Sequence, residues 1–188
     1  YANLPKYDNK RYISLSDEEI IKLNESIYNY PDLQLRCFFM LGLFGRRKGE
    51  IVNLKWEQVN FEHSTITCLN TKNGSTQSFP LNKKAMSVIN ESYESKISNW
   101  VFPSSSGIFY YNGFNLAWNR LKKKIGLKIR FHDIRHSYAS HLASSNRVDI
   151  YTLKKLLGHN DINLTMRYAY LIDDVVKNAN NVIDDIFT

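Results

Sequence analysis

The sequence is poor in cysteine, proline and glycine, and it contains no long apolar run. Only 2 of its 188 residues are cysteines, Cys37 and Cys68, so neither a disulfide framework nor a cysteine-based zinc site is indicated. No apolar run approaches the roughly 20 residues that span a bilayer, and no signal-peptide pattern precedes the first predicted helix. These absences favour a protein of the reducing cytoplasm without a membrane segment.

The composition fits a globular domain with a basic surface. Hydrophobic residues make up 43% of the chain, which is enough to bury a core. The net charge of +7 favours an anionic partner such as nucleic acid or an acidic membrane surface, although many basic proteins bind neither. The chain starts at Tyr1 with a polar stretch. We expect residues 1–14 to be a linker from another domain, 15–172 the main domain, and 173–188 a terminal helix.

Most of the chain has the apolar spacing of helices. Ser16 and Glu19 form a capping-box pattern before the first one. The second is apolar almost all round, which is typical of a helix buried in the core. The last one should carry Tyr168. The predicted helices cover about 17–28, 33–44, 84–93, 114–125 closed by Gly126, a segment after Phe131, 149–157 before Gly158, and a short segment around Tyr168.

A β-hairpin is predicted between these helices, from about Gln58 to Pro80. This segment alternates polar residues with Thr, Ile, Phe and Val, and it contains the turn dipeptide Asn73-Gly74. Lys72 lies at the predicted turn, where a solvent-exposed lysine is the ordinary interpretation.

Four segments carry side chains that suit phosphate chemistry. In GRRKGEI, Arg47 and Glu50 are spaced to pair on one helical turn. In HDIRH, His132 and Arg135 are one turn apart and could donate to the same phosphate oxygens. Surface ion pairs, helix caps and packing explain such residues equally well when each motif is taken alone.

The other two segments are LLGH, which ends at His159, and TMRYAY, which contains Tyr168 nine residues later. A metal site is disfavoured. Although His132 and His136 are four apart, no glutamate follows His132 and no third ligand has suitable spacing.

Taken together and in this order, the motifs resemble the catalytic domain of tyrosine recombinases, the family of phage and transposon integrases and Xer-type resolvases. The resemblance runs from about Asp17 to Tyr170 and includes LGLFGRRKGEIVNLKWEQVNF, TKNGSTQSFPL and HDIRHSYASHL. Two positions depart from the family pattern, because Arg46 stands at a commonly apolar position and Tyr170 at one that is often histidine. The implied fold is mainly α with a small three-stranded antiparallel β-sheet.

The resemblance implies a site-specific recombinase that cuts DNA without a metal or other cofactor. Tyr168 would form a 3′-phosphotyrosyl bond, and strand exchange would pass through a Holliday junction. Arg47 and Arg135 would stabilise the negative charge on the phosphate. His132 would accept a proton or contact the phosphate, His159 would donate a hydrogen bond, and Lys72 would protonate the leaving 5′-oxygen. Glu50 and Asp133 would orient these catalytic residues.

The expected partners are a double-stranded recombination site, three further copies in a homotetramer, and an N-terminal DNA-binding domain of the same protein. The terminal helix at 173–188 would pack on a neighbouring protomer, or else serve as an intramolecular lid. A type IB topoisomerase or telomere resolvase is the nearer alternative, and a non-catalytic DNA-binding module the more distant one. Candidate DNA contacts are Arg46, Lys122, Lys123, Lys124, Lys128 and Arg130.

Overall fold

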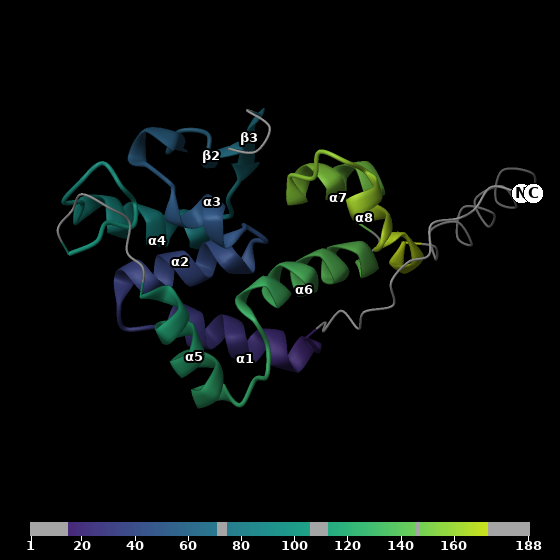
Figure 1. Ribbon diagram of the computed structural model, residues 1–188, viewed down its shortest axis with the longest axis horizontal. Helices are drawn as coiled ribbons and strands as arrows, with labels where there is room; N and C mark the ends of the chain where they lie inside the picture. Colours follow the sequence, from purple (N-terminus) through teal and green to yellow (C-terminus); the bar gives the residue numbers. More distant parts are fainter. Residues whose placement is uncertain (1–14, 71–74, 106–112, 146, 173–188) are drawn as a thin grey trace, which may run out of the picture. The chain divides into compact units, whose positions relative to one another are not determined.

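The computed structural model describes residues 15–70, 75–105, 113–145 and 147–172. These residues form two compact units, 15–135 and 136–172, and α6 starts in the first and continues into the second (Figure 1). The elements are α1 Asp17–Tyr28, α2 Leu33–Leu43, α3 Lys48–Val52, η1 Trp56–Gln58, β1 Val59–Asn60, β2 Thr65–Asn70, β3 Ser75–Pro80, α4 Lys83–Glu94, α5 Phe114–Ile125, α6 Phe131–Ser144, α7 Ile150–Leu157, α8 Asn163–Met166 and η2 Ala169–Leu171. None of the helices in this part of the chain is long and apolar enough to cross a membrane.

The helix boundaries predicted from capping residues are confirmed. At α1, the Ser16 hydroxyl accepts from the Glu19 backbone, and the Glu19 carboxylate accepts from the Ser16 backbone. Gly126 ends α5 with a φ of 77°, and Gly158 ends α7 with a φ of 63°. Both angles lie in the left-handed region that glycine adopts without a steric penalty. Local sequence therefore determines where these helices begin and end.

The predicted hairpin is also present, as part of a three-stranded antiparallel sheet in the order β1-β2-β3. Pairing between β2 and β3 runs from Thr65 opposite Pro80 to Asn70 opposite Ser75. This register leaves residues 71–74 as the connection. Lys72 is one of them and lies outside the described residues, so its predicted place at the turn stays a prediction.

In the unit 15–135, the apolar helix α2 lies at the centre of the core and packs against α1, α3 and α4 (Figure 1). Phe38 of α2 stacks on Phe114 of α5 with ring centroids 3.7 Å apart, and on Phe131 at the start of α6 at 5.0 Å. These aromatic contacts fix the position at which α6 begins, one residue before His132.

The unit 136–172 has a small core of its own, formed by α6 from His136 onward, α7, α8 and η2. The buried members are Ala139, Ala143, Leu153, Leu157 and Tyr168. The prediction that a short helix carries Tyr168 is wrong. α8 ends at Met166, and Tyr168 directly precedes the single turn η2, so it lies between two helical turns. The predicted helix at 173–188 falls outside the described residues.

Candidate active site

The Arg47 guanidinium is held at the start of α3 by the carboxylate of Glu50. Arg47 Nη1 lies 2.8 Å from Glu50 Oε1, and the Arg47 backbone N–H donates to Glu50 Oε2 at 2.9 Å. One carboxylate thus caps the helix and orients the guanidinium. The Arg47 side chain remains 36% exposed, so it can still reach an anion. The ion pair that the spacing predicted is present.

The Arg135 guanidinium is anchored to the loop that leads into α3. Arg135 is 4% exposed, and its Nη1 donates to the carbonyl oxygen of Gly45. Gly45 adopts a φ of 75°, a conformation that strongly favours glycine. This contact joins the first turns of α6 to the segment that carries Arg47, so both arginines belong to one rigid arrangement within the unit 15–135.

His132 lies in the electrostatic field of these arginines. The pKa of its imidazole is lowered from 6.5, first by partial desolvation and then by the positive charge of Arg135, with smaller effects from Arg130 and Arg47. Asp133 acts in the opposite direction. An imidazole with a lowered pKa is mostly neutral at pH 7 and can accept a proton or a hydrogen bond. The unit 15–135 therefore gathers guanidinium groups around a neutral histidine.

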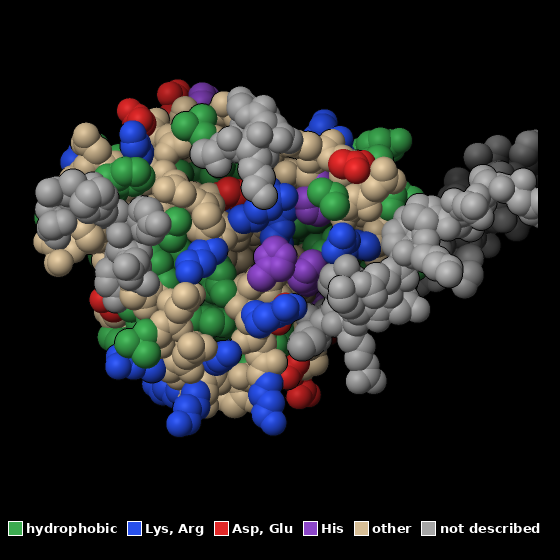
Figure 2. All heavy atoms as spheres, in the orientation of Figure 1, with side chains coloured by type: hydrophobic (Ala, Val, Ile, Leu, Met, Phe, Trp, Pro, Cys, Tyr) green, Lys and Arg blue, Asp and Glu red, His purple; other side chains and the backbone are tan. Residues whose placement is uncertain are grey.

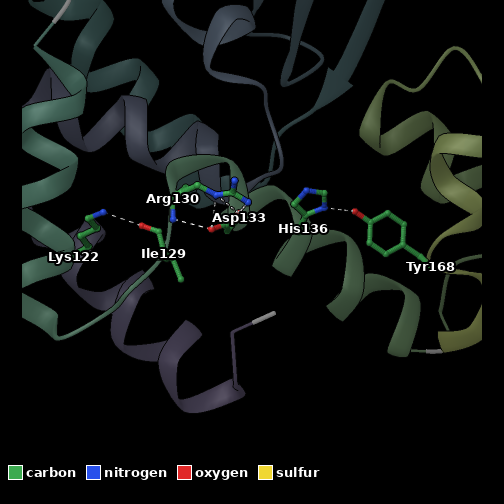
Figure 3. Close-up of polar contacts among 6 residues, drawn as sticks. All are labelled: Lys122, Ile129, Arg130, Asp133, His136 and Tyr168. Atoms are coloured by element: carbon green, nitrogen blue, oxygen red, sulfur yellow. Dashed lines mark hydrogen bonds and ion pairs between the residues drawn. The ribbon is translucent and has the colours of Figure 1, made fainter. Parts of the chain in front are cut away.

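Asp133, which we expected to orient catalytic residues, is 2% exposed and pairs with Arg130. Its carboxylate accepts from the Arg130 backbone N–H and from Nη2, each at 2.8 Å (Figure 3). It therefore fixes the start of α6 and the direction of Arg130. The Arg130 side chain is 80% exposed.

Arg46, which we expected to contact DNA, is buried in this structure, and that contact stays a prediction. Arg46 is 4% exposed, and its guanidinium carbon lies 3.4 Å from the centre of the Phe79 ring. It packs against the sheet by a cation–π contact. This arginine, at a commonly apolar position, thus packs as part of the core.

The other predicted DNA contacts differ in their surroundings. Lys122 is half-buried and its Nζ donates to the carbonyl of Ile129 at 3.2 Å. Lys123, Lys124 and Lys128 are exposed. In Figure 2, Lys and Arg side chains gather along the edge of the molecule over α5. Their contact with DNA stays a prediction.

In the unit 136–172, His159 follows the glycine that ends α7, as the sequence predicted. Its Nδ1 lies 2.8 Å from the hydroxyl of Thr165, a residue with no exposed surface. The Tyr168 backbone N–H donates to the carbonyl of the same threonine at 2.9 Å. Thr165 therefore fixes His159 through its side chain and Tyr168 through its backbone.

The Tyr168 hydroxyl contacts a histidine whose spacing in the sequence had suggested only a metal ligand. It lies 2.7 Å from Nδ1 of His136, which points toward the ring from α6 (Figure 3). Tyr168 is 4% exposed within the core of its unit. The spacing of His136, Ala139 and Ala143 along one helix face was a usable signal for this contact.

The comparisons with known proteins identify the family. A family model described as the phage integrase family matches residues 14–173. The chain belongs to this family. The "Tyrosine recombinase XerA" of Pyrococcus horikoshii is 30% identical over 93% of this chain and 62% of its own length. The "Shufflon-specific DNA recombinase" of Escherichia coli is 27% identical over 89% of this chain and 42% of its own length. The chain thus spans about half the length of such relatives.

Solved structures show the same phage integrase fold. The XerH site-specific recombinase in a post-cleavage complex with its palindromic difH substrate superposes with a TM-score of 0.77 at 21% identity, covering 96% of this chain and 56% of that one. The catalytic domain of bacteriophage HP1 integrase gives a TM-score of 0.67 at 22% identity, covering 89% of this chain and 93% of that one. At these identities the likeness establishes the fold, and the expected mainly α architecture with a three-stranded sheet is confirmed.

Two other nucleophiles of this phage integrase domain are excluded by their surroundings. Burial raises the pKa of both the Cys37 and the Cys68 thiol to about 12. A thiol with so high a pKa carries almost no thiolate at neutral pH. Tyr168 stays the nucleophile that the sequence predicts.

Proposed function

We propose that this chain is the catalytic part of a site-specific DNA recombinase that cuts and rejoins DNA through a covalent bond to Tyr168. The observation that carries the proposal is the contact of Arg135 with the Gly45 carbonyl, which ties the α6 turn that holds His132 to the segment that holds Arg47. A cluster of positive charge next to a neutral imidazole is suited to a phosphodiester. The family membership and the names of the relatives support the same class of activity.

In the proposed cleavage, the Tyr168 hydroxyl oxygen attacks the phosphorus and the bond from phosphorus to the 5′-oxygen breaks. The phenol gives up its proton to His132, and the leaving 5′-oxygen takes one from Lys72. Arg47 and Arg135 stabilise the charge that builds up on the non-bridging oxygens, and His132 and His159 contact the phosphate. Both arginines are always charged at neutral pH. They supply the charge stabilisation that a metal ion would otherwise provide.

The 3′-phosphotyrosyl bond keeps the bond energy, so a 5′-hydroxyl of another strand can reverse the step. Two such exchanges on paired sites pass through a Holliday junction and need four active protomers. We therefore propose a homotetramer on two DNA sites in the cytoplasm. The exposed basic residues around α5 would follow the DNA backbone. The full-length protein would add a DNA-binding domain.

The experiment is a covalent trap in which the protein itself selects its DNA site. The protein is incubated with a pool of randomised duplexes that carry a nick, so that cleavage releases a short strand and rejoining is blocked. DNA that stays attached to protein after denaturation is then recovered and sequenced. We expect one enriched sequence, with adducts that survive EDTA. Binding without any adduct would instead support the non-catalytic DNA-binding module.

A further inference from the structure

Tyr168 is held by two kinds of contact, apolar packing around its ring and a hydrogen bond at its hydroxyl. The ring lies in the apolar core of the unit 136–172, against Ala139, Ala143, Leu153 and Leu157. Its hydroxyl lies 2.7 Å from His136 Nδ1. The two rings are tilted by 41° with centroids 6.4 Å apart, so they meet through the hydrogen bond and are not stacked. The apolar contacts hold the ring and with it the oxygen, whereas the hydrogen bond holds the hydroxyl toward His136.

The sequence of α6 is suited to this arrangement. His136, Ala139 and Ala143 follow one another at intervals of three and four residues and therefore share one face of the helix. Both alanines have no exposed surface. Their small side chains leave room for the Tyr168 ring, and the imidazole one turn earlier meets its hydroxyl.

The direction of the hydrogen bond depends on which ring nitrogen of His136 carries the proton. A tyrosine phenol has a pKa near 10 in water and keeps its proton at neutral pH. When the proton of a neutral imidazole is on Nε2, the phenol donates to Nδ1, and this is the tautomer that a positioning role for His136 requires. A buried hydroxyl that lost this acceptor would be left without its partner or would have to turn away.

We propose that His136 is a positioning residue for the nucleophile, and that it fixes the Tyr168 hydroxyl in the orientation from which it attacks DNA. This inference rests on the proposed function, because it takes Tyr168 as the nucleophile. Orientation matters for such a step, since a displacement of about 1 Å in a reacting atom can reduce the rate on the order of a hundredfold. His136 acts through Tyr168 and not on the phosphate.

A first experiment examines the contact without DNA. In the full chain with 15N-labelled histidine, the ring nitrogens of His136 should show the Nε2–H form with Nδ1 as acceptor. Tyr168→Phe should shift the His136 signals, and Tyr170→Phe, which removes an exposed phenol two residues away, should leave them unchanged. Equal signals in all three proteins would overturn the proposed contact.

A second experiment measures adduct formation on the trapped duplex, with His136→Ala and His136→Asn. Asparagine places an amide oxygen near the former Nδ1 and can accept the hydrogen bond. We expect Ala to slow adduct formation by tenfold or more and Asn to restore most of the rate. His63→Ala, at an exposed histidine in the other unit, is the matched control. Rates for Ala equal to wild type, or an Asn variant as slow as Ala, would overturn the inference.

A third arm shows whether His136 acts through the tyrosine. In Tyr168→Phe, hydrogen peroxide is supplied as a small external nucleophile, so cleavage depends on the phosphate-binding residues alone. Adding His136→Ala should then change the rate less than twofold, and a large loss would contradict positioning through Tyr168. If the wild type itself forms no adduct on any duplex, the proposed function fails, while the NMR result still decides the hydrogen bond.

Discussion

The two units of the described chain hold their candidate catalytic residues by different kinds of contact. In 15–135, Arg47 is held by a carboxylate and Arg135 by a backbone carbonyl. In 136–172, His159 is held by the Thr165 hydroxyl and Tyr168 by the His136 imidazole. Hydrogen bonds to charged groups contribute about 1.5–3 kcal/mol, compared with about 0.5–1.5 kcal/mol for neutral ones.

This difference matches what each group must do in the proposed reaction. A guanidinium that binds phosphate keeps its charge and its place from start to finish, so a strong contact to the protein does not hinder it. A tyrosine hydroxyl that forms a bond to phosphorus must lose its proton and exchange its hydrogen-bond partner. A single neutral hydrogen bond orients such a group and is readily given up.

The largest expected effect comes from removing the nucleophile alone. Tyr168→Phe should abolish the covalent adduct, because no oxygen remains to attack, and should leave DNA binding intact, because the residues around Arg135 are unchanged. Adducts are detected on denaturing gels and binding by mobility shift. Tyr170→Phe is the control, since Tyr170 is 70% exposed. An adduct that persists in Tyr168→Phe would mean that another residue is the nucleophile.

Removing one charged group from the other unit should have the next largest effect. Arg47→Ala should reduce adduct formation on the order of 10²–10³-fold, the usual loss for one donor to a developing negative charge. Cleavage of DNA by peroxide in the Tyr168→Phe background should fall by the same factor. Arg47 would stabilise the charge on the phosphate whichever nucleophile attacks it.

Arg36→Ala is the matched control for this prediction, since Arg36 pairs with Glu91 at 3.4 Å on the surface of the same unit. It should behave like the wild type. A comparable loss of adduct in Arg36→Ala would mean that net charge, and not the position of Arg47, sets the rate.

The separation of the contacting residues along the chain explains how far the sequence could be interpreted. Contacts within a few residues were predictable, such as the pairing of Arg47 with Glu50 and the glycine ends of α5 and α7. Contacts over long separations were not. Nothing local indicates that Arg135 donates to Gly45, 90 positions earlier, and the small-residue face of α6 beside His136 does not show that its partner is Tyr168, 32 positions later.

Arg46 and Tyr168 show two further limits. A charged residue in a basic run predicts exposure, but tertiary packing places the Arg46 guanidinium over Phe79. The apolar spacing around Tyr168 predicts a helix, but α8 stops at Met166. In both cases packing against distant residues outweighs the local pattern.

A third prediction concerns the residue that fixes both His159 and Tyr168. Thr165→Val keeps the shape of the side chain and removes the hydroxyl that contacts His159 Nδ1. Loss of one neutral hydrogen bond of about 1.4 kcal/mol corresponds to a change of about tenfold in rate. We expect that reduction in adduct formation, with an unchanged dissociation constant for DNA.

Thr152→Val is the control for Thr165→Val, because the Thr152 hydroxyl bonds to Asp149 in the same unit and contacts no candidate catalytic residue. Its adduct rate should match that of the wild type. If the two valine variants lose activity equally, the effect is one of general stability and Thr165 has no special role in orienting His159.

A fourth prediction alters the packing beneath the charged cluster. A methyl group added at Gly42 would lie 2.4 Å from the ring of Phe131, at the first residue of α6. Gly42→Ala should destabilise the protein by about 1–3 kcal/mol, as overpacked cores do. At Gly49, nothing lies within 4 Å of the added methyl. Gly49→Ala should therefore be neutral or slightly stabilising, and urea unfolding of both variants measures the difference.

The smallest expected effect is a shift in the titration of His132. Because desolvation and then Arg135 lower its pKa, the imidazole should titrate below 6.5 in an NMR measurement without DNA. The unfolded chain then binds its proton more readily than the folded one. The contribution of His132 to folding stability is therefore full above pH 6.5 and decreases as the pH falls toward the folded-state pKa.

Arg47→Ala should raise the titration midpoint of His132 slightly, since Arg47 has the smallest of the four charge effects. Bound DNA should raise it further, because a phosphate stabilises the imidazolium. A midpoint at or above 6.5 in the free protein would contradict the view that the guanidinium groups of 15–135 act together on one site. It would leave the contacts around Tyr168 untouched, since those are made by residues of the other unit.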